Sequence, residues 1–163
     1  MRWTAVAASV AAVVIAVVVV RTQFIDTVTV ASDSMAPTVC GGDTIVVRRL
    51  DNGTEVEVDD IVTFTGPADG QPTIKRVVAV AGQSVSIKDA GLFVDGHEID
   101  ENYVDHAEID GVYTPTVTVP PGHVFVLGDH RETSIDSRIF GPLPTEAING
   151  RLLFTLWSEC PTT

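Results

Sequence analysis

Lysine is almost absent from this 163-residue chain, which has only Lys75 and Lys88 against 22 acidic residues. The formal net charge is −12, so the surface does not attract nucleic acid by charge, and we expect no nucleic-acid partner. Cysteine is also rare. Cys40 and Cys160 do not form the clustered ligand set of a metal site, and the four histidines lack the spacing of a zinc site. We therefore expect neither a metal nor a cofactor.

The two cysteines leave two interpretations open. In an exported domain Cys40 and Cys160 could pair in a disulfide. The alternative is two unpaired thiols, one near a serine-bearing turn and one in the C-terminal tail. The sequence does not decide between them, because it does not say whether the two residues lie within bonding distance.

Charge is missing from one long apolar run near the N-terminus. Residues 3–20 contain no charged residue, glycine or proline and lie between Arg2 and Arg21. Eighteen helical residues span about 27 Å, which is just enough to cross the hydrocarbon core of a bilayer. A cleaved secretory signal is the alternative, but its apolar region is typically about 7–15 residues long. The predicted organisation is a short tail (1–2), a transmembrane anchor (3–20), a juxtamembrane connector (21–30) and a β-domain (31–163).

Short β-strand patterns separated by turn residues follow the apolar run. Asp95-Gly96, directly after an apolar segment, predicts a hairpin, and a helical turn is expected at 144–148 with Thr145 as its cap. The strands are too closely spaced for βαβ crossovers, so we predict an all-β fold, a coiled antiparallel sheet or barrel-like domain. The predicted strands cover residues 44–48, 61–64, 84–88, 92–94, 117–119, 124–127 and 152–157.

Two segments carry candidate catalytic residues. Residues 32–38 form a short polar turn that bears Ser32 and Ser34, and Lys75 lies inside the apolar run 73–80. A lysine on a central strand is costly to bury unless it is neutral or paired, and burial lowers the pKa of its amine from about 10.4. A neutral amine can take the proton of a serine, so Ser34 is the candidate nucleophile and Lys75 the candidate base. The Ser34 amide and the Ser32 hydroxyl could stabilise an oxyanion.

Each of these residues also has a simpler interpretation. Serine, aspartate and proline are common in ordinary surface turns. Lys75 could lie on the solvent face of an edge strand. A histidine-dependent triad built on His130 is a further alternative, although Lys75 fits the role of base better.

A dense polar loop spans residues 128–138, directly after the predicted strand 124–127. Two acids and two bases within it could simply be a solvated charge cluster. The position after a strand favours a folded structural clasp beside the site instead, in which Ser134 hydrogen-bonds the lysine amine and orients it. These two acids and two bases are Asp129, Asp136, Arg131 and Arg138.

These segments together resemble the bacterial-type signal peptidase I family. Residues 32–38 resemble its SxSMxPT box, 74–78 its base-bearing box and 128–138 its GDNRxxSxDSR box, in the same order along the chain. The similarity covers essentially the whole chain, and three ordered boxes are highly specific. The chain departs from the usual pattern at His130, where the box has asparagine, and at Asp33, where glycine is frequent.

The resemblance implies a membrane-anchored serine endopeptidase that removes signal peptides from exported preproteins after small residues. It implies that Ser34 is the nucleophile, Lys75 the general base, Ser32 an oxyanion donor and Ser134 the residue that orients the lysine. It also implies a single-pass protein of the cell membrane, in contact with lipid through its N-terminal helix, with the catalytic domain outside the cytoplasm. An ion pair between Asp136 and Arg138 is expected beside the site. Residues expected to line the substrate pockets are Val30, Met35, Val39 and Ile74.

Two other functions are compatible with parts of the sequence. A self-cleaving regulator of the repressor type shares the Ser/Lys dyad and the β-fold, but would carry a DNA-binding domain where this chain has an apolar segment. A non-enzymatic anchored β-domain would not need Ser34, Lys75 and Ser134, which are all intact.

Overall fold

The computed structural model describes residues 9–15, 24–51, 53–89, 91–104 and 113–160, and its strands form two antiparallel sheets. The larger sheet has the order β1-β2-β11-β3-β4-β9-β10 and the smaller one the order β7-β6-β5-β8. The larger sheet consists of β1 (Ile25–Thr29), β2 (Thr44–Arg49), β11 (Ile148–Trp157), β3 (Ile61–Thr65), β4 (Pro72–Val80), β9 (His123–Leu127) and β10 (Leu143–Pro144). The smaller sheet consists of β7 (His97–Ile99), β6 (Gly91–Val94), β5 (Ser84–Lys88) and β8 (Thr114–Thr118).

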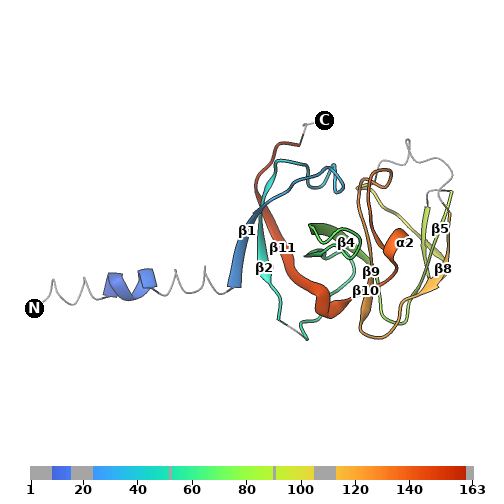
Figure 1. The fold of residues 1–163 in the computed structure, drawn as a ribbon, viewed down its shortest axis with the longest axis horizontal. Coiled ribbons are helices and arrows are strands. Elements are labelled where there is room, and N and C mark those ends of the chain that lie inside the picture. The colour runs from blue at the N-terminus through green and yellow to red at the C-terminus, as the bar shows by residue number, and fades with distance from the viewer. Residues whose placement is uncertain (1–8, 16–23, 52, 90, 105–112, 161–163) are drawn as a thin grey trace, which may run out of the picture.

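The predicted β class is confirmed. Every segment that we expected as a strand lies in or overlaps one, and the Asp95-Gly96 turn joins β6 to β7 with φ angles of 51° and 80°. The larger sheet is open, because within the described part of the chain no ladder joins β1 to β10. Figure 1 shows β4 and β9 between the β1, β2 and β11 strands on one side and β5 and β8 on the other. The fold is therefore two separate sheets, with β4 and β9 of the larger sheet packed against the smaller one, and the larger sheet does not close into a barrel.

Strand β1 was missed, because residues 25–29 belong to the segment that we expected to be a connector. These residues pair with β2 along their whole length, from Ile25 opposite Arg48 to Thr29 opposite Thr44. β1 is the edge strand of the larger sheet and is only partly buried, so its residues lack the strong apolar alternation of an internal strand.

The predicted anchor over residues 3–20 lies mostly outside the described residues. Of that segment, 9–15 are described and are helical. Among the residues that the structure describes, no helix has both the length and the apolar character needed to cross a bilayer. The anchor therefore stays a prediction.

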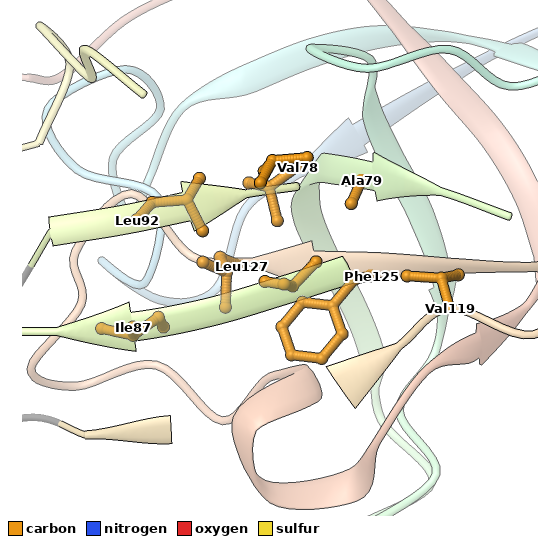
Figure 2. Packing of buried hydrophobic residues seen from close by; sticks show 9 residues of the cluster. Val78, Ala79, Ile87, Leu92, Val119, Phe125 and Leu127 are labelled. Atoms are coloured by element: carbon orange, nitrogen blue, oxygen red, sulfur yellow. The ribbon is translucent and has the colours of Figure 1, made fainter. Parts of the chain in front are cut away.

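The core between the two sheets is formed by apolar side chains from β4, β5, β6 and β9 (Figure 2). Phe125 and Leu127 of β9 are completely buried there, opposite Ile87 and Leu92 of the smaller sheet. Burying one such side chain contributes about 1.5–3 kcal/mol, so this cluster fixes the smaller sheet against β9.

Strand β4 is buried on both faces, and this decides the environment of Lys75. Ile74 belongs to an apolar cluster with Val30 and Ile45, whereas Val77 belongs to a second cluster on β3 and β9. β4 also pairs with β3 on one side and β9 on the other. The interpretation of Lys75 as an exposed residue of an edge strand is therefore wrong.

Two helical turns flank the C-terminal strands. The expected turn is present as a 3₁₀ helix (Thr145–Ala147), but its N-cap residue is Pro144, and Thr145 Oγ1 instead donates to the Gly122 carbonyl at 3.1 Å. The cap that we assigned to Thr145 is wrong. Helix α2 (Ser137–Phe140) was missed, although Asp136 is an N-cap residue of a favoured type and its side chain accepts from the Arg138 amide.

The two cysteines form a disulfide, which settles the alternatives left open by the sequence. Cys40 and Cys160 lie 120 residues apart in the chain and their Cα atoms are 5.3 Å apart. The bond ties the segment after β11 to the turn that bears Ser34.

Candidate active site

Ser34 and Lys75 meet in the structure, although 41 residues separate them. Lys75 Nζ lies 2.7 Å from Ser34 Oγ and donates a hydrogen bond of 2.8 Å to the Ile74 carbonyl. Both residues are buried, with 8% of Ser34 and 3% of Lys75 exposed. The two groups are therefore positioned for proton transfer from the hydroxyl to the amine.

Burial lowers the pKa of Lys75 to about 8, against the opposing effect of the Asp136 and Asp129 carboxylates. Desolvation disfavours the charged ammonium, whereas nearby negative charge favours it. Since desolvation is the larger effect, a substantial fraction of Lys75 is a neutral amine at mildly alkaline pH.

The turn that carries the serines is held by hydrogen bonds to the backbone and the side chain of Asp33. The Ala36 amide donates to the Asp33 carbonyl at 2.9 Å, and the Gly41 amide donates to Asp33 Oδ1 at 2.8 Å. The Ser32 hydroxyl lies 3.3 Å from Ser34 Oγ. Ser32 is thus beside the candidate nucleophile, where a donor to a developing oxyanion would be needed.

Ser134 lies close to the dyad without contacting the lysine. Its hydroxyl is buried and has no hydrogen-bond partner within the described part of the chain. It comes next to Gly128, where an added Cβ would overlap both Ser134 Oγ and the Ser34 carbonyl oxygen. Gly128 is therefore needed for the close approach of the polar loop to the serine turn.

Gly128→Ala is expected to lower the free energy of unfolding by about 1–3 kcal/mol, because the methyl group forces the serine turn and the polar loop apart. Chemical denaturation measures the change. Gly91→Ala is the matched control. Its added Cβ would come no closer than 3.2 Å to its neighbours, so we expect a change within about 0.5 kcal/mol. Equal stability of the two variants would contradict the close approach.

The polar loop contains the expected ion pair. Arg138 Nε and Asp136 Oδ1 are 2.8 Å apart, and Asp136 Oδ2 accepts a hydrogen bond of 3.1 Å from the Gly128 amide. Arg138 Nη2 also donates to the Arg131 carbonyl at 2.6 Å. These contacts join the beginning of the loop to its end, and Gly128 lies next to the serine turn.

Asp129 and Arg131 of the same loop have partners that the sequence analysis missed. Asp129 pairs with Arg76 at 2.7 Å, and Arg131 pairs with Glu101 at 2.5 Å. Both pairs are nearly or completely buried, so loss of either partner would leave a costly uncompensated charge. A signal was present for Arg76, since a second cation in the apolar run 73–80 also requires a buried partner.

The two ion pairs are joined through Tyr103. The Arg76 guanidinium lies 3.9 Å from the centre of the Tyr103 ring, and the Tyr103 hydroxyl donates to Glu101 at 3.0 Å. Thr38, at the end of the serine turn, donates to Asp129 at 2.5 Å. The segment that follows β7 is thereby connected to the serine turn and to the strand that bears Lys75.

An open groove of about 1100 Å³ runs beside the dyad. Both dyad residues line it, as do Val30 and Ile74, which we expected in the substrate pocket. Met35 and Val39 do not line it. They are completely buried in the apolar cluster that contains Val30 and Ile74, so the assignment of these two residues to the pocket surface is wrong.

His130 also lines the groove, but its ring does not contact the serine hydroxyl. Its Nδ1 lies 3.3 Å from the Asp33 carbonyl oxygen and 3.1 Å from Thr133 Oγ1, whereas Ser34 Oγ is within hydrogen-bond distance of Lys75. The geometry favours the lysine over a histidine-dependent triad. Within the described residues, no group of three or more His, Cys, Asp or Glu side chains is arranged to hold a metal ion.

The chain is similar in sequence to known signal peptidases. The family model described as signal peptidase, peptidase S26, matches residues 2–157. The chain is 38% identical over 134 residues to a probable signal peptidase I-1 of Synechocystis sp. The match covers 77% of this chain and 67% of that protein. It is 35% identical over 156 residues to signal peptidase I V of Bacillus subtilis. That match covers 88% of this chain and 92% of that protein.

A solved signal peptidase I from Enterococcus faecalis V583 has a similar structure. The TM-score is 0.54 at 31% sequence identity, and the match covers 61% of this chain and 98% of that chain. The chain therefore belongs to the signal peptidase family, peptidase S26, and is a hydrolase of the signal peptidase I type.

Proposed function

We propose that this protein is a membrane-anchored serine endopeptidase that cleaves signal peptides from exported preproteins after small residues. The observation that carries the proposal is the 2.7 Å distance between Lys75 Nζ and Ser34 Oγ, in a buried site that opens onto a long groove. A serine and a depressed-pKa lysine at this distance are the nucleophile and general base of a Ser/Lys hydrolase.

In the first half of the reaction, Ser34 Oγ attacks the carbonyl carbon of the scissile peptide while neutral Lys75 takes the hydroxyl proton. The carbonyl oxygen becomes negative and is stabilised by the Ser34 amide and the Ser32 hydroxyl. When the C–N bond breaks, the Lys75 ammonium gives its proton to the leaving amine. In the second half, water attacks the serine ester, Lys75 takes the water proton, and the proton returns to Ser34.

The orientation of the lysine amine is part of this proposal. A neutral amine has two N–H groups and one lone pair. One N–H is directed to the Ile74 carbonyl, and the lone pair must face Ser34 Oγ. The Ser134 hydroxyl, which has no partner among the described residues, is the acceptor that we propose for the second N–H. A small rearrangement in the substrate complex would bring it into range.

The groove suits an extended peptide. It is lined by edge strand β1, whose outer backbone groups are available for pairing with a substrate strand, and by the first half of β4. Val30 and Ile74 line the groove and are only 5% and 7% exposed, and we expect their apolar side chains to bound the space for small side chains next to the cleavage site.

Exposed apolar side chains support the membrane location. Four of them lie on the last half of β11, and Phe24 directly precedes β1 at the other end of these strands. Transfer of such side chains from water is favourable at a bilayer surface. The residues are Phe24, Leu153, Phe154, Leu156 and Trp157. We propose that the domain stands outside the cytoplasm, with the anchor at residues 3–20 in the cell membrane.

The direct test is cleavage of a purified preprotein, followed by sequencing of the new N-terminus. We expect a single cut that leaves a small residue at the end of the signal peptide. A cut within this chain itself, with the preprotein left intact, would favour the self-cleaving regulator, and no cut at all would favour the binding domain.

The pH dependence of cleavage is expected to follow Lys75. A base must be neutral to act, so kcat/KM should rise with pH through a single ionisation near pH 8. At pH 7, roughly a tenth of the enzyme would carry a neutral Lys75. Peptide cleavage measured from about pH 5 to 10 checks this. A rate that stays constant down to about pH 6 would contradict the assignment.

Removal of residues 1–20 is expected to leave an enzyme that cleaves a soluble peptide as well as the full chain does. β1 begins at Ile25, so the truncation leaves the sheet intact. Cleavage of a membrane-embedded preprotein should become slower, because the anchor no longer concentrates the enzyme at the bilayer. The full-length protein in the same vesicles is the control. A truncated protein that fails on the soluble peptide would show that the N-terminal segment contributes to the site.

A further inference from the structure

The peptide unit between Asp33 and Ser34 joins two groups that matter for catalysis. It carries the Asp33 carbonyl at one side and the Ser34 amide at the other. The unit is planar, and the cis bond found in the described chain is elsewhere, between Ala36 and Pro37, so these two groups point in opposite directions. Any contact that fixes the Asp33 oxygen therefore fixes the direction of the Ser34 N–H.

His130 holds the carbonyl groups on both sides of this nucleophile. Its backbone amide donates to the Ser34 carbonyl at 3.2 Å, and its ring Nδ1 lies 3.3 Å from the Asp33 carbonyl oxygen. The Ala36 amide also reaches the Asp33 oxygen, but from within the same turn. His130 comes from the polar loop 97 residues away, so it holds the serine turn against a separate part of the fold.

The neighbours of Nδ1 indicate which ring nitrogen carries the proton. An unprotonated Nδ1 would place its lone pair against the lone pairs of the Asp33 oxygen, which is repulsive. Thr133 Oγ1, 3.1 Å from Nδ1, fits either tautomer, because a hydroxyl can donate or accept. The Asp33 oxygen only accepts, so its contact is the one that favours a protonated Nδ1.

From this geometry we propose that His130 is a positioning residue, whose Nδ1–H holds the Asp33 carbonyl and so directs the Ser34 amide at the substrate oxyanion. The proposal rests on the function proposed above, because it assigns the oxyanion role to the Ser34 amide. It also accounts for the asparagine that the GDNRxxSxDSR box has at this position. Asparagine Nδ2 and histidine Nδ1 are the same number of bonds from the backbone, and each can donate one N–H there.

This equivalence provides a discriminating set of variants. His130→Asn keeps a donor at the δ position. His130→Asp has the shape of asparagine but carries only acceptors at neutral pH, and His130→Leu carries neither a donor nor an acceptor. With the full chain in detergent micelles and a preprotein substrate, we expect the asparagine variant to keep kcat within about threefold. The aspartate and leucine variants should lose about 10–100-fold in kcat with little change in KM, since the oxyanion forms only in the transition state. Glu132→Gln is the control in the same loop and should keep wild-type kcat, because Glu132 is exposed and does not line the groove.

A purely structural role for the ring predicts a different pattern. The asparagine variant would then be as impaired as the leucine variant, or KM and kcat would change together. Either result would overturn the proposal, as would an aspartate variant with wild-type kcat.

A second measurement does not depend on activity. In the wild-type full chain, ¹⁵N NMR of the neutral His130 ring should place the proton on Nδ1, and a proton on Nε2 would overturn the proposal. If the wild-type protein fails to cleave the preprotein, the proposed function fails, while the NMR result still decides whether His130 holds the turn. If the wild-type protein cleaves and the variant pattern fails, only the inference about His130 is wrong.

Discussion

Ser34→Ala is expected to abolish cleavage and to leave the fold unchanged. The substitution deletes one oxygen, whose neighbours are the Lys75 amine and the Ser32 hydroxyl, and Lys75 keeps its bond to the Ile74 carbonyl. Loss of a serine nucleophile costs on the order of 10⁶-fold in kcat in a well-studied serine protease. Single-turnover assays of preprotein cleavage measure the loss, and thermal unfolding checks the fold.

Ser32→Ala is the matched control for the nucleophile. It removes a hydroxyl from the same turn but leaves the Ser34 amide in place, so the loss should reach at most about 10²–10³-fold. If Ser34→Ala retained measurable activity, or if the two variants were equally impaired, Ser34 would not be the nucleophile. An unfolded Ser34→Ala variant would show that the hydroxyl has a structural role instead.

Lys75→Arg is expected to be as inactive as Lys75→Ala across the whole pH range. Arginine keeps the positive charge and the approximate length, but its guanidinium does not lose a proton in proteins and cannot act as a base. A mechanism based on His130 predicts the reverse, with an active Lys75→Arg variant and an inactive His130→Ala variant. Peptide cleavage from about pH 5 to 10 separates the two mechanisms.

The fold of these lysine variants needs its own control, since Lys75 is only 3% exposed. Lys75→Met fills nearly the same volume without a charge, so it should be folded and inactive. Circular dichroism and thermal unfolding of the three variants distinguish loss of the base from loss of the structure. Substantial activity in any folded Lys75 variant would exclude the Ser34–Lys75 dyad.

The sequence predicted the dyad through the combination of its segments, because neither the serine turn nor Lys75 alone excluded a simpler interpretation. The ion pair of Asp136 with Arg138 was expected from the family resemblance and spans only two residues. The pairs formed by Arg76 with Asp129 and by Arg131 with Glu101 span 53 and 30 residues. No local pattern specifies such pairs, because they depend on how the two sheets come together.

The direction in which apolar side chains point was also not predictable from the sequence. Val30, Met35, Val39 and Ile74 are all apolar and close to the serine or the lysine in sequence, so the sequence did not separate those that face the groove from those in the core. β1 was missed for a related reason, since an edge strand has a weak apolar pattern and pairing with β2 is what stabilises it.

The Cys40–Cys160 bond has a consequence for how each new molecule matures. The two cysteines are 120 residues apart, and at about 5–20 residues per second the ribosome needs roughly 6–24 s to make that length. Throughout this interval Cys40 is an unpaired thiol next to the unfinished serine turn, exposed to other thiols. The bond can close only after the lysine strand, the polar loop and β11 have all been synthesised, so the order of synthesis makes the covalent closure of this domain one of its last steps.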